Sequence, residues 1–225
     1  MQAQTAVVIG ATGLIGEQLV QELLQDATFG KIVLLVRRPI PLSHPKLEIR
    51  IVDFNDLNDL SAKLGEGDAV FCCVGTTRSK VKGNKEAYRK VDYDIPVNTA
   101  RRAVQQGFTE FLVVSAVGAS TASGSFYLQL KGSMEEDVRG IPFRSVHIFR
   151  PSLLLGKRKE FRLGERIAQV IFPAISFLLP GGLSKYKAIS DTTVAKAILA
   201  AARQAKQGIH EYEYNEIQQL AKASH

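Results

Sequence analysis

The 225-residue sequence has little cysteine, little methionine and no tryptophan. Its two cysteines, Cys72 and Cys73, are adjacent, and neighbouring side chains of a strand point to opposite faces. A disulfide between them is therefore geometrically unfavourable, which excludes a disulfide-stapled secreted scaffold. We expect two reduced thiols in a cytoplasmic protein, with a redox pair as the minor alternative.

Long apolar runs are also missing. The longest, 167–179, is interrupted by Pro173 and is shorter than the roughly 20 residues that a membrane-spanning helix needs. The N-terminus lacks a basic segment followed by an apolar run, which predicts no signal peptide. Three interpretations of 167–179 stay open, in decreasing order of preference: a substrate-pocket lid, a subunit contact, and an interfacial helix that contacts a membrane. A monomer and a homodimer are both compatible with the sequence.

Motifs for metal binding and for hydrolysis are absent. The four histidines are scattered, and none lies near a cysteine or an acidic pair at metal-ligand spacing, so we expect no metal site. No G-x-S-x-G sequence is present, which argues against a serine hydrolase. The net charge is +7, and basic residues concentrate in 78–90 and 157–166. Few aromatic residues interleave with them, so we favour a solvated surface that steers an anionic ligand and expect no nucleic-acid partner.

The apolar residues are arranged as in an α/β protein. Runs rich in Val, Ile and Leu alternate with segments of helical periodicity. The predicted strands are 6–9, 31–36, 47–52, 69–74, 111–114 and 144–149, and the predicted helices are 17–25, 57–64, 85–106 and 126–139. Within 85–106, Pro96 is expected to kink or restart the helix, with Asp94 as a cap. Repeated βαβ units predict a doubly wound parallel sheet, that is, a Rossmann fold.

The alternation stops after about Pro151, where a segment with several glycines and prolines begins. We expect a single domain over 1–225 in which about 152–210 contributes a small substrate cap. Such a cap would cover the carboxyl edge of the sheet, where open α/β sheets bind their ligands.

A glycine motif directly follows the first predicted strand. Gly10, Gly13 and Gly16 have the spacing G-x-x-G-x-x-G and precede an amphipathic segment. Gly10 permits a tight turn, Gly13 lets a pyrophosphate approach the backbone, and Gly16 lets the helix lie close to the strand. The anion would then bind to N–H groups at the helix N-terminus. The strand–turn–helix context favours a dinucleotide site over a structural turn.

Two arginines follow the second predicted strand. In a dinucleotide-binding fold a carboxylate at this place holds the ribose hydroxyls, whereas Arg37 and Arg38 stand here. Arginine guanidinium groups match phosphate geometry. We therefore predict NADP(H) rather than NAD(H) as the cofactor, against the simpler reading of a surface arginine pair.

A second constellation lies in the later half of the chain. Tyr127 and Lys131 are four residues apart, which places both on one face of the predicted helix. The lysine charge would lower the pKa of the phenol and make it a usable proton donor. Ser115 lies at the carboxyl end of the fifth predicted strand, where its hydroxyl could bind a substrate carbonyl. The three together are more specific than Tyr-x-x-x-Lys alone.

These features resemble the short-chain dehydrogenase/reductase superfamily, in its atypical, extended-like branch. The matching marks cover nearly the whole chain: the glycine turn at 10–16, Asp53, Ser115, Tyr127 with Lys131, 150–153 and 190–198. Within the branch, 73–78 (CVGTTR) and 126–132 (FYLQLKG) are similar to the Tat-interacting-protein type of oxidoreductase and its bacterial relatives.

The resemblance implies a set of residues that line the cofactor from pyrophosphate to nicotinamide. They are Gly10, Thr12, Gly13, Leu14 and Ile15 at the pyrophosphate, Arg37 with Arg38 at the 2′-phosphate, Asp53 with Phe54 at the adenine, Gly75 and Thr76 along the cofactor, and Pro151 with Leu153 beside the nicotinamide. It also implies that Tyr127 is the general acid/base, that Lys131 binds the nicotinamide ribose, and that Ser115 polarises the carbonyl.

The chain departs from the family pattern at two positions. Ala116 stands where many members carry a second Ser or Thr, and Asp92 stands where many extended members have Asn. Asn98 is open to two readings, a proton relay and a capping or surface role. The departures affect the expected proton pathway more than cofactor binding.

We therefore expect an NADP(H)-dependent oxidoreductase that transfers hydride between nicotinamide and a carbonyl or alcohol carbon of a small molecule. The alternative is a regulatory or scaffold protein that senses NADP(H) without turnover. A basic nucleic-acid binder ranks last.

Overall fold

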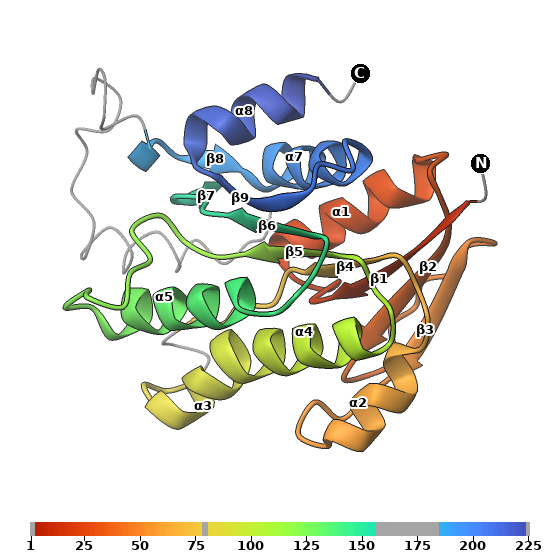
Figure 1. The fold of residues 1–225 in the computed structure, drawn as a ribbon, viewed down its shortest axis with the longest axis horizontal. Coiled ribbons are helices and arrows are strands. Elements are labelled where there is room, and N and C mark those ends of the chain that lie inside the picture. Colours follow the sequence, from red (N-terminus) through yellow and green to blue (C-terminus); the bar gives the residue numbers. More distant parts are fainter. Residues whose placement is uncertain (1–2, 78–80, 156–184, 224–225) are drawn as a thin grey trace.

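The structure is a computed structural model that describes residues 3–77, 81–155 and 185–223. A parallel sheet of seven strands runs through the middle of the molecule in the order β3-β2-β1-β4-β5-β6-β9 (Figure 1). Its strands are β1 (Gln4–Ile9), β2 (Phe29–Val36), β3 (Leu47–Ile51), β4 (Ala69–Cys72), β5 (Glu110–Val114), β6 (Ser145–Phe149) and β9 (Gly208–Tyr212). A second, two-stranded sheet pairs β7 (Leu154–Leu155) with β8 (Ile189–Ser190). This confirms the predicted doubly wound parallel sheet.

Helices cover both faces of the main sheet (Figure 1). One layer contains α1 (Leu14–Gln25), α7 (Asp191–Arg203) and α8 (Tyr214–Lys222). The other contains α2 (Leu57–Leu64), α3 (Lys85–Arg89), the π-helical turn η1 (Lys90–Asp94), α4 (Ile95–Gln105) and α5 (Phe126–Arg139). In the part of the chain that the structure describes, no helix is long and apolar enough to cross a membrane.

The two helical layers explain why the strands are continuous apolar runs. Successive residues of a strand point to opposite faces, so a strand covered on both sides needs an apolar residue at every position. In β1, Ala6 and Val8 pack into the cluster beneath α1 and α7, whereas Val7 and Ile9 pack into the cluster on the other face. All four are fully buried.

The C-terminal region differs from the prediction. Alternation of strand and helix resumes at Ile189, and residues 191–212 form α7 and the edge strand β9 of the main sheet. The assignment of 152–210 to a cap is therefore corrected for 191–210. Strand β9 was missed because its sequence, GIHEY, has little of the apolar character of a central strand and is exposed along most of its length. The apolar segment 167–179 lies outside the described residues.

The predicted helix 85–106 contains a wider turn before its proline. Pro96 has no N–H, so the helix cannot make its usual bond to the carbonyl four residues earlier. The Ile95 N–H instead donates to the Lys90 carbonyl, an i to i−5 bond that defines the π-helical turn. The expected cap at Asp94 is wrong, since its side chain makes no capping hydrogen bond. Asn84 caps the segment by accepting from the Ala87 N–H at 3.0 Å.

The loop between β5 and α5 packs against the helix at a glycine. The Ser120 N–H donates to the Leu128 carbonyl at 3.1 Å. A Cβ on Gly132 would lie 2.4 Å from the Ser120 carbonyl carbon and 2.5 Å from the Thr121 nitrogen. Both are backbone atoms that cannot move aside as a flexible side chain does. A residue without a side chain is therefore required here to keep the loop on α5.

We predict that Gly132→Ala lowers the free energy of unfolding by about 1–3 kcal/mol, because overpacking forces the loop away from the helix. Denaturant unfolding measures the loss. Gly124→Ala in the same loop is the matched control: a Cβ there meets nothing within 4 Å, so its effect should stay within about 0.5 kcal/mol. Equal effects of the two substitutions would contradict the packing argument.

Candidate functional site

The turn after β1 requires glycine at two positions. Gly10 has φ +80°, and a Cβ on it would lie 2.6 Å from the carbonyl carbon and oxygen of Cys73, at the end of β4. A Cβ on Gly16 would lie 2.1 Å from the Gly10 carbonyl oxygen. The glycines thus let the turn approach β4 and let α1 pack on the turn, as the sequence predicts.

The same turn presents the N-terminus of α1. Gly13 is the N-cap residue, its N–H donates to the Gly10 carbonyl at 2.9 Å, and no side chain caps the helix there. The first N–H groups of a helix have no partners within the helix. Together with the helix dipole they can bind an anion next to Leu14 and Ile15, with the exposed Thr12 beside them. This cradle fits the pyrophosphate of a dinucleotide.

The expected phosphate-binding and adenine-binding residues lie at the same edge of the sheet. Arg37 and Arg38 are exposed directly after β2. Ile9 pairs with Leu35, so the glycine turn begins close to these arginines. Asp53 follows β3, and its carboxylate accepts from the Asn55 backbone N–H and side-chain amide, both at 2.9 Å. These hydrogen bonds lower the pKa of Asp53 below its ordinary value.

Gly75 and Thr76 follow β4, beside the glycine turn, since the Cys73 N–H donates to the Ile9 carbonyl at 2.9 Å. The Thr76 N–H donates to the Asp92 carboxylate at 2.9 Å. We name 75–76 the β4 loop.

Lys131 is buried in an ion pair with Asp92. Its ammonium lies 3.0 Å from Asp92 Oδ1 and donates to the Val114 carbonyl at 3.3 Å. The lysine is 2% exposed and the aspartate 1%. A buried charge needs a partner of opposite sign, because desolvation of an unpaired ion costs several kcal/mol. Asp92 supplies that partner for Lys131.

The structure corrects the expected effect of Lys131 on Tyr127. Burial, and after it the negative charge of Asp92, raise the pKa of the Tyr127 phenol above its ordinary value. A lowered pKa was expected because neither the burial of the phenol nor the carboxylate partner of Lys131 can be read from the sequence. The rings of Tyr88 and Tyr127 pack edge to face with centroids 5.8 Å apart, and the Tyr88 hydroxyl donates to the Thr76 carbonyl at 3.1 Å.

Ser115 follows β5 directly, as predicted. Its side chain is 4% exposed, and its hydroxyl has no hydrogen-bond partner among the residues that the structure describes. A buried hydroxyl without a partner costs free energy in a folded protein, and such groups are rare. Its position at the carboxyl edge is consistent with a hydroxyl that binds a ligand oxygen.

Pro151 and Leu153 follow β6 at the same edge. The Val117 N–H donates to the Pro151 carbonyl at 3.0 Å, and the Ile189 N–H donates to the Leu153 carbonyl at 2.9 Å. The first bond joins the segment after β6 to the segment after Ser115, and the second joins it to β8. The structure therefore brings all the predicted site residues to one edge, on strand ends and the helices that follow.

Sequence reasoning missed two residues of this site. Asp92 was noted only as a departure from the family pattern, and its partner could not be identified without the fold. Tyr88 was not considered, because nothing in its spacing relates it to Tyr127. Asn98, for which a proton relay was one reading, lies half-buried on α4. A further unpredicted contact anchors this edge: Arg150 lies 2.5 Å from the buried Glu135 of α5 and 2.6 Å from Glu211 of β9.

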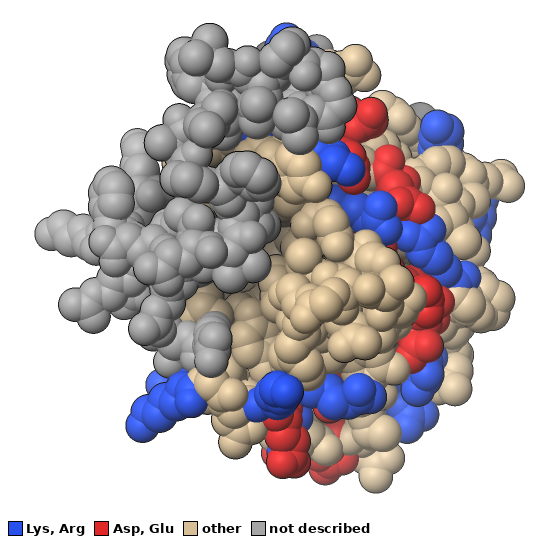
Figure 2. Space-filling model, turned by 90° about the vertical axis from the view of Figure 1, so that its left-hand side faces the viewer, with Lys and Arg blue, Asp and Glu red and all other residues tan. Residues whose placement is uncertain are grey.

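Figure 2 shows the end of the molecule that lies on the left in Figure 1. Lys and Arg atoms line its lower rim. Basic residues of the loop before α3, of α3 itself and of the start of η1 are exposed, among them Lys82, Lys85, Arg89 and Lys90. Within the described ranges, no group of three or more His, Cys, Asp or Glu residues could hold a metal ion.

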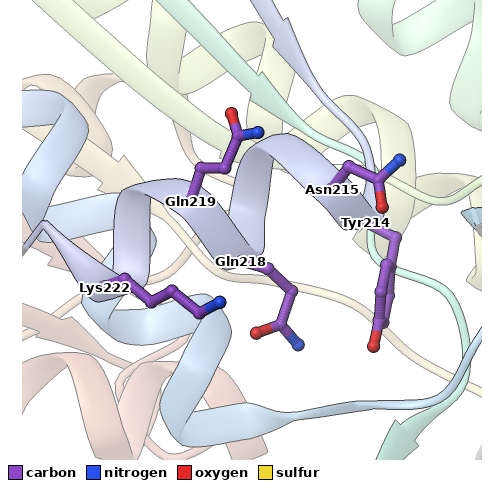
Figure 3. A pocket seen from close by; sticks show the side chains of 5 residues that line it. All are labelled: Tyr214, Asn215, Gln218, Gln219 and Lys222. Carbon is purple, nitrogen blue, oxygen red and sulfur yellow. The ribbon is translucent and has the colours of Figure 1, made fainter.

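A hollow beside α8 is a different feature. Its described lining comes from one polar helix face: Tyr214, Asn215, Gln218, Gln219 and Lys222 (Figure 3). None of these belongs to the predicted site. The hollow lacks the apolar walls and convergent polar groups typical of a small-molecule site, so we assign no ligand to it.

Comparisons with known proteins agree with this description. A family model described as NAD(P)H-binding matches residues 10–143. Protein HTATIP2 of Rattus norvegicus is 32% identical over 202 residues, which are 88% of this chain and 81% of that protein. "Protein FMP52, mitochondrial" of Eremothecium gossypii is 36% identical over 159 residues, which are 71% and 70% of the two chains.

Solved structures share the fold. MoeE5, determined in complex with UDP-glucuronic acid and NAD, superposes with a TM-score of 0.70 at 20% identity, over 97% of this chain and 81% of that one. A UDP-N-acetylglucosamine 4-epimerase from Methanobrevibacter ruminantium M1 gives 0.70 at 18% identity, over 99% and 81%. At these identities the likeness shows the fold alone.

We predict that Ser115→Ala leaves the free energy of unfolding unchanged or raises it by up to about 1 kcal/mol, because it removes an unsatisfied buried hydroxyl. Ser145→Ala is the matched control. Its buried hydroxyl donates to the Lys206 carbonyl at 2.6 Å and contacts His147 at 2.8 Å, so we expect a loss of about 1–2 kcal/mol. Denaturant unfolding compares the two. A clear loss for Ser115→Ala would assign its hydroxyl to the fold rather than to a ligand.

Proposed function

The chain belongs to the NAD(P)H-binding family, in the atypical branch of the short-chain dehydrogenase/reductase superfamily, and from that premise we propose that it is an NADP(H)-dependent oxidoreductase. Its substrate would be a small carbonyl compound or the corresponding alcohol. The observation that carries the proposal is the buried, unpartnered Ser115 hydroxyl, at the same sheet edge as the glycine cradle and the Tyr127–Lys131 helix.

The binding half of the proposal uses the first strands of the sheet. The turn at Gly10 and the N-terminus of α1 hold the pyrophosphate through backbone N–H groups. Arg37, with Arg38, holds the 2′-phosphate through charge-assisted hydrogen bonds. Gly75 and Thr76, which follow β4, line the side of the cofactor site. When bound, the nicotinamide supplies or accepts the hydride.

The catalytic half uses β5 and α5. Ser115 donates a hydrogen bond to the substrate oxygen and polarises the carbonyl. Tyr127 donates a proton to that oxygen in reduction and removes it in oxidation. An ammonium has three N–H donors, and the Val114 carbonyl accepts one from Lys131, whose charge is paired with that of Asp92. A further N–H donor of this ammonium is assigned to the nicotinamide ribose. The Ser115 hydroxyl stays neutral throughout the reaction.

One observation favours a second function, an NADP(H) sensor without turnover. The charge of Lys131 is balanced by Asp92, and the pKa of Tyr127 is raised rather than lowered. With a raised pKa, little of Tyr127 is present at neutral pH as the phenolate that would act as the base. A sensor would bind the dinucleotide with the same residues and use neither Ser115 nor Tyr127 for chemistry.

We predict that Tyr127→Phe lowers the kcat of carbonyl reduction by about 100-fold or more, because general acid catalysis contributes this much. Fluorescence titration should show NADPH binding within a factor of about two of the unsubstituted protein. Tyr93→Phe is the control, since the Tyr93 hydroxyl bonds to Asp137 on α5 and lies outside the proposed site.

The assay is NADPH consumption with a panel of aldehydes, ketones and quinones. Unchanged turnover in Tyr127→Phe would contradict the proposed mechanism. NADPH binding by the unsubstituted protein, with no turnover across the panel, would favour the sensor.

We predict that Arg37→Ala weakens NADPH binding by about 10-fold or more and leaves NADH binding unchanged, because a charge-assisted hydrogen bond to the 2′-phosphate is lost. Isothermal titration with both cofactors measures this. Arg101→Ala on α4 is the control, as Arg101 is an exposed arginine that pairs with Asp137. Equal affinities of the unsubstituted protein for NADPH and NADH would overturn the cofactor assignment.

A further inference from the structure

Asp92 has a position in the helix that the local sequence explains. It lies in the π-helical turn η1, where the Ile95 N–H bonds to the Lys90 carbonyl. Pro96, four residues after Asp92, has no N–H to offer the Asp92 carbonyl, and the widened turn results. Turns of this kind occur frequently at functional sites. Here the turn carries a carboxylate that is almost fully buried.

The two oxygens of this carboxylate face two different elements, one in an ion pair and the other in a hydrogen bond. Oδ1 lies 3.0 Å from the Lys131 ammonium on α5, and Oδ2 accepts the Thr76 N–H at 2.9 Å. A Cβ on Gly75 would be 3.6 Å from Oδ1, so the β4 loop lies directly against the carboxylate. Asp92 therefore joins the loop that lines the cofactor in the proposed function to the lysine of the catalytic helix.

The charge of Asp92 also reaches the ionisable groups around it. Those that face it are Lys131 and Tyr127 on α5, Tyr88 on α3 and the Cys72 thiol on β4. Burial raises the pKa of all three of the acids, and the Asp92 charge raises each further, because a second negative charge nearby is unfavourable. Lys131 is the positive charge among them.

We propose that Asp92 is a positioning residue that fixes Lys131 against the β4 loop and, by balancing its charge, sets the pH range in which Tyr127 exchanges a proton. The claim about proton exchange by Tyr127 rests on the proposed function. The claim that Asp92 fixes Lys131 against the β4 loop concerns the ion pair alone and does not depend on turnover. An asparagine at this position would keep an acceptor for Thr76 but would leave the ammonium unbalanced.

The sign of the effect follows from the charges. In Asp92→Asn, an unbalanced Lys131 favours the phenolate, so Tyr127 ionises at a lower pH. Alcohol oxidation needs the phenolate and increases as pH rises, so its midpoint should move to lower pH. Carbonyl reduction needs the neutral phenol and decreases as pH rises, so this loss should also begin at lower pH.

The first test is spectroscopic and needs no substrate. The ultraviolet absorbance of phenolate is titrated in each protein with and without Tyr127→Phe, and the difference isolates Tyr127. We expect Asp92→Asn to move the Tyr127 midpoint down by about one pH unit or more. Asp94→Asn is the matched control. It lies on the same turn and pairs with the exposed Arg89 at 3.4 Å, so its midpoint should equal that of the unsubstituted protein.

The second test is the pH profile of alcohol oxidation. The kcat midpoint of Asp92→Asn should move down by the same amount, so that below both midpoints the variant is about 10-fold faster or more. Coincident titrations of Asp92→Asn and the unsubstituted protein would overturn the proposal. If the titration shifts but neither protein turns over substrate, the claim about the ion pair is supported and the proposed oxidoreductase function is rejected.

If Asp92→Asn does not fold, the double variant Asp92→Asn/Lys131→Met removes both charges together, which buried ion pairs commonly tolerate. Because the two charges oppose each other, we expect its Tyr127 midpoint to stay within about half a pH unit of that of the unsubstituted protein. A rise of more than one unit would show that Lys131 acts without a counterbalance from Asp92 and would overturn the proposal.

Discussion

The close contact between the Gly10 turn and the end of β4 is the constraint on which the rest of the site depends. A single Cβ at Gly10 would collide with the Cys73 backbone, so only glycine lets these chain segments meet. The contact brings the N-terminus of α1 next to the β4 loop. Asp92 then ties that loop to Lys131, and Lys131 contacts the carbonyl of Val114, one residue before Ser115. Backbone packing at one glycine is thus linked, contact by contact, to the strand end that carries Ser115.

The Asp92–Lys131 pair has two effects that oppose each other. It holds the lysine in place, and the negative charge of Asp92 raises the pKa of Tyr127, opposite to the effect of a lone lysine. Buried pairs of this kind contribute little net stability, because desolvation offsets the attraction. Their value is in fixing one arrangement of side chains. In this chain that arrangement joins the β4 loop to the helix that carries Tyr127.

The sequence was sufficient for the parts of the fold that local rules determine. Val7 and Ile9 alternate with Ala6 and Val8 in an unbroken apolar run, and such a run indicates a strand buried on both faces. Residues that follow strands, such as Arg37 and Ser115, were placed correctly because parallel strands end at one edge. The sequence was insufficient where an interaction partner is distant along the chain or where the apolar pattern of a strand is weak. Strand β9 is an edge strand with few apolar residues, and the Asp92–Lys131 pair joins residues 39 positions apart. The expected direction of the Tyr127 pKa was wrong because burial of the phenol, and after it the Asp92 charge, raise this pKa, and both depend on the fold.

The most direct measurement of the central claim is a crystal structure with bound NADP⁺ and a small carbonyl compound. The account predicts the pyrophosphate against the Gly10–Gly16 turn and the carbonyl oxygen within about 2.6–3.2 Å of both the Ser115 and Tyr127 hydroxyls. A dinucleotide bound elsewhere, or a Tyr127 hydroxyl directed away from the carbonyl, would contradict it.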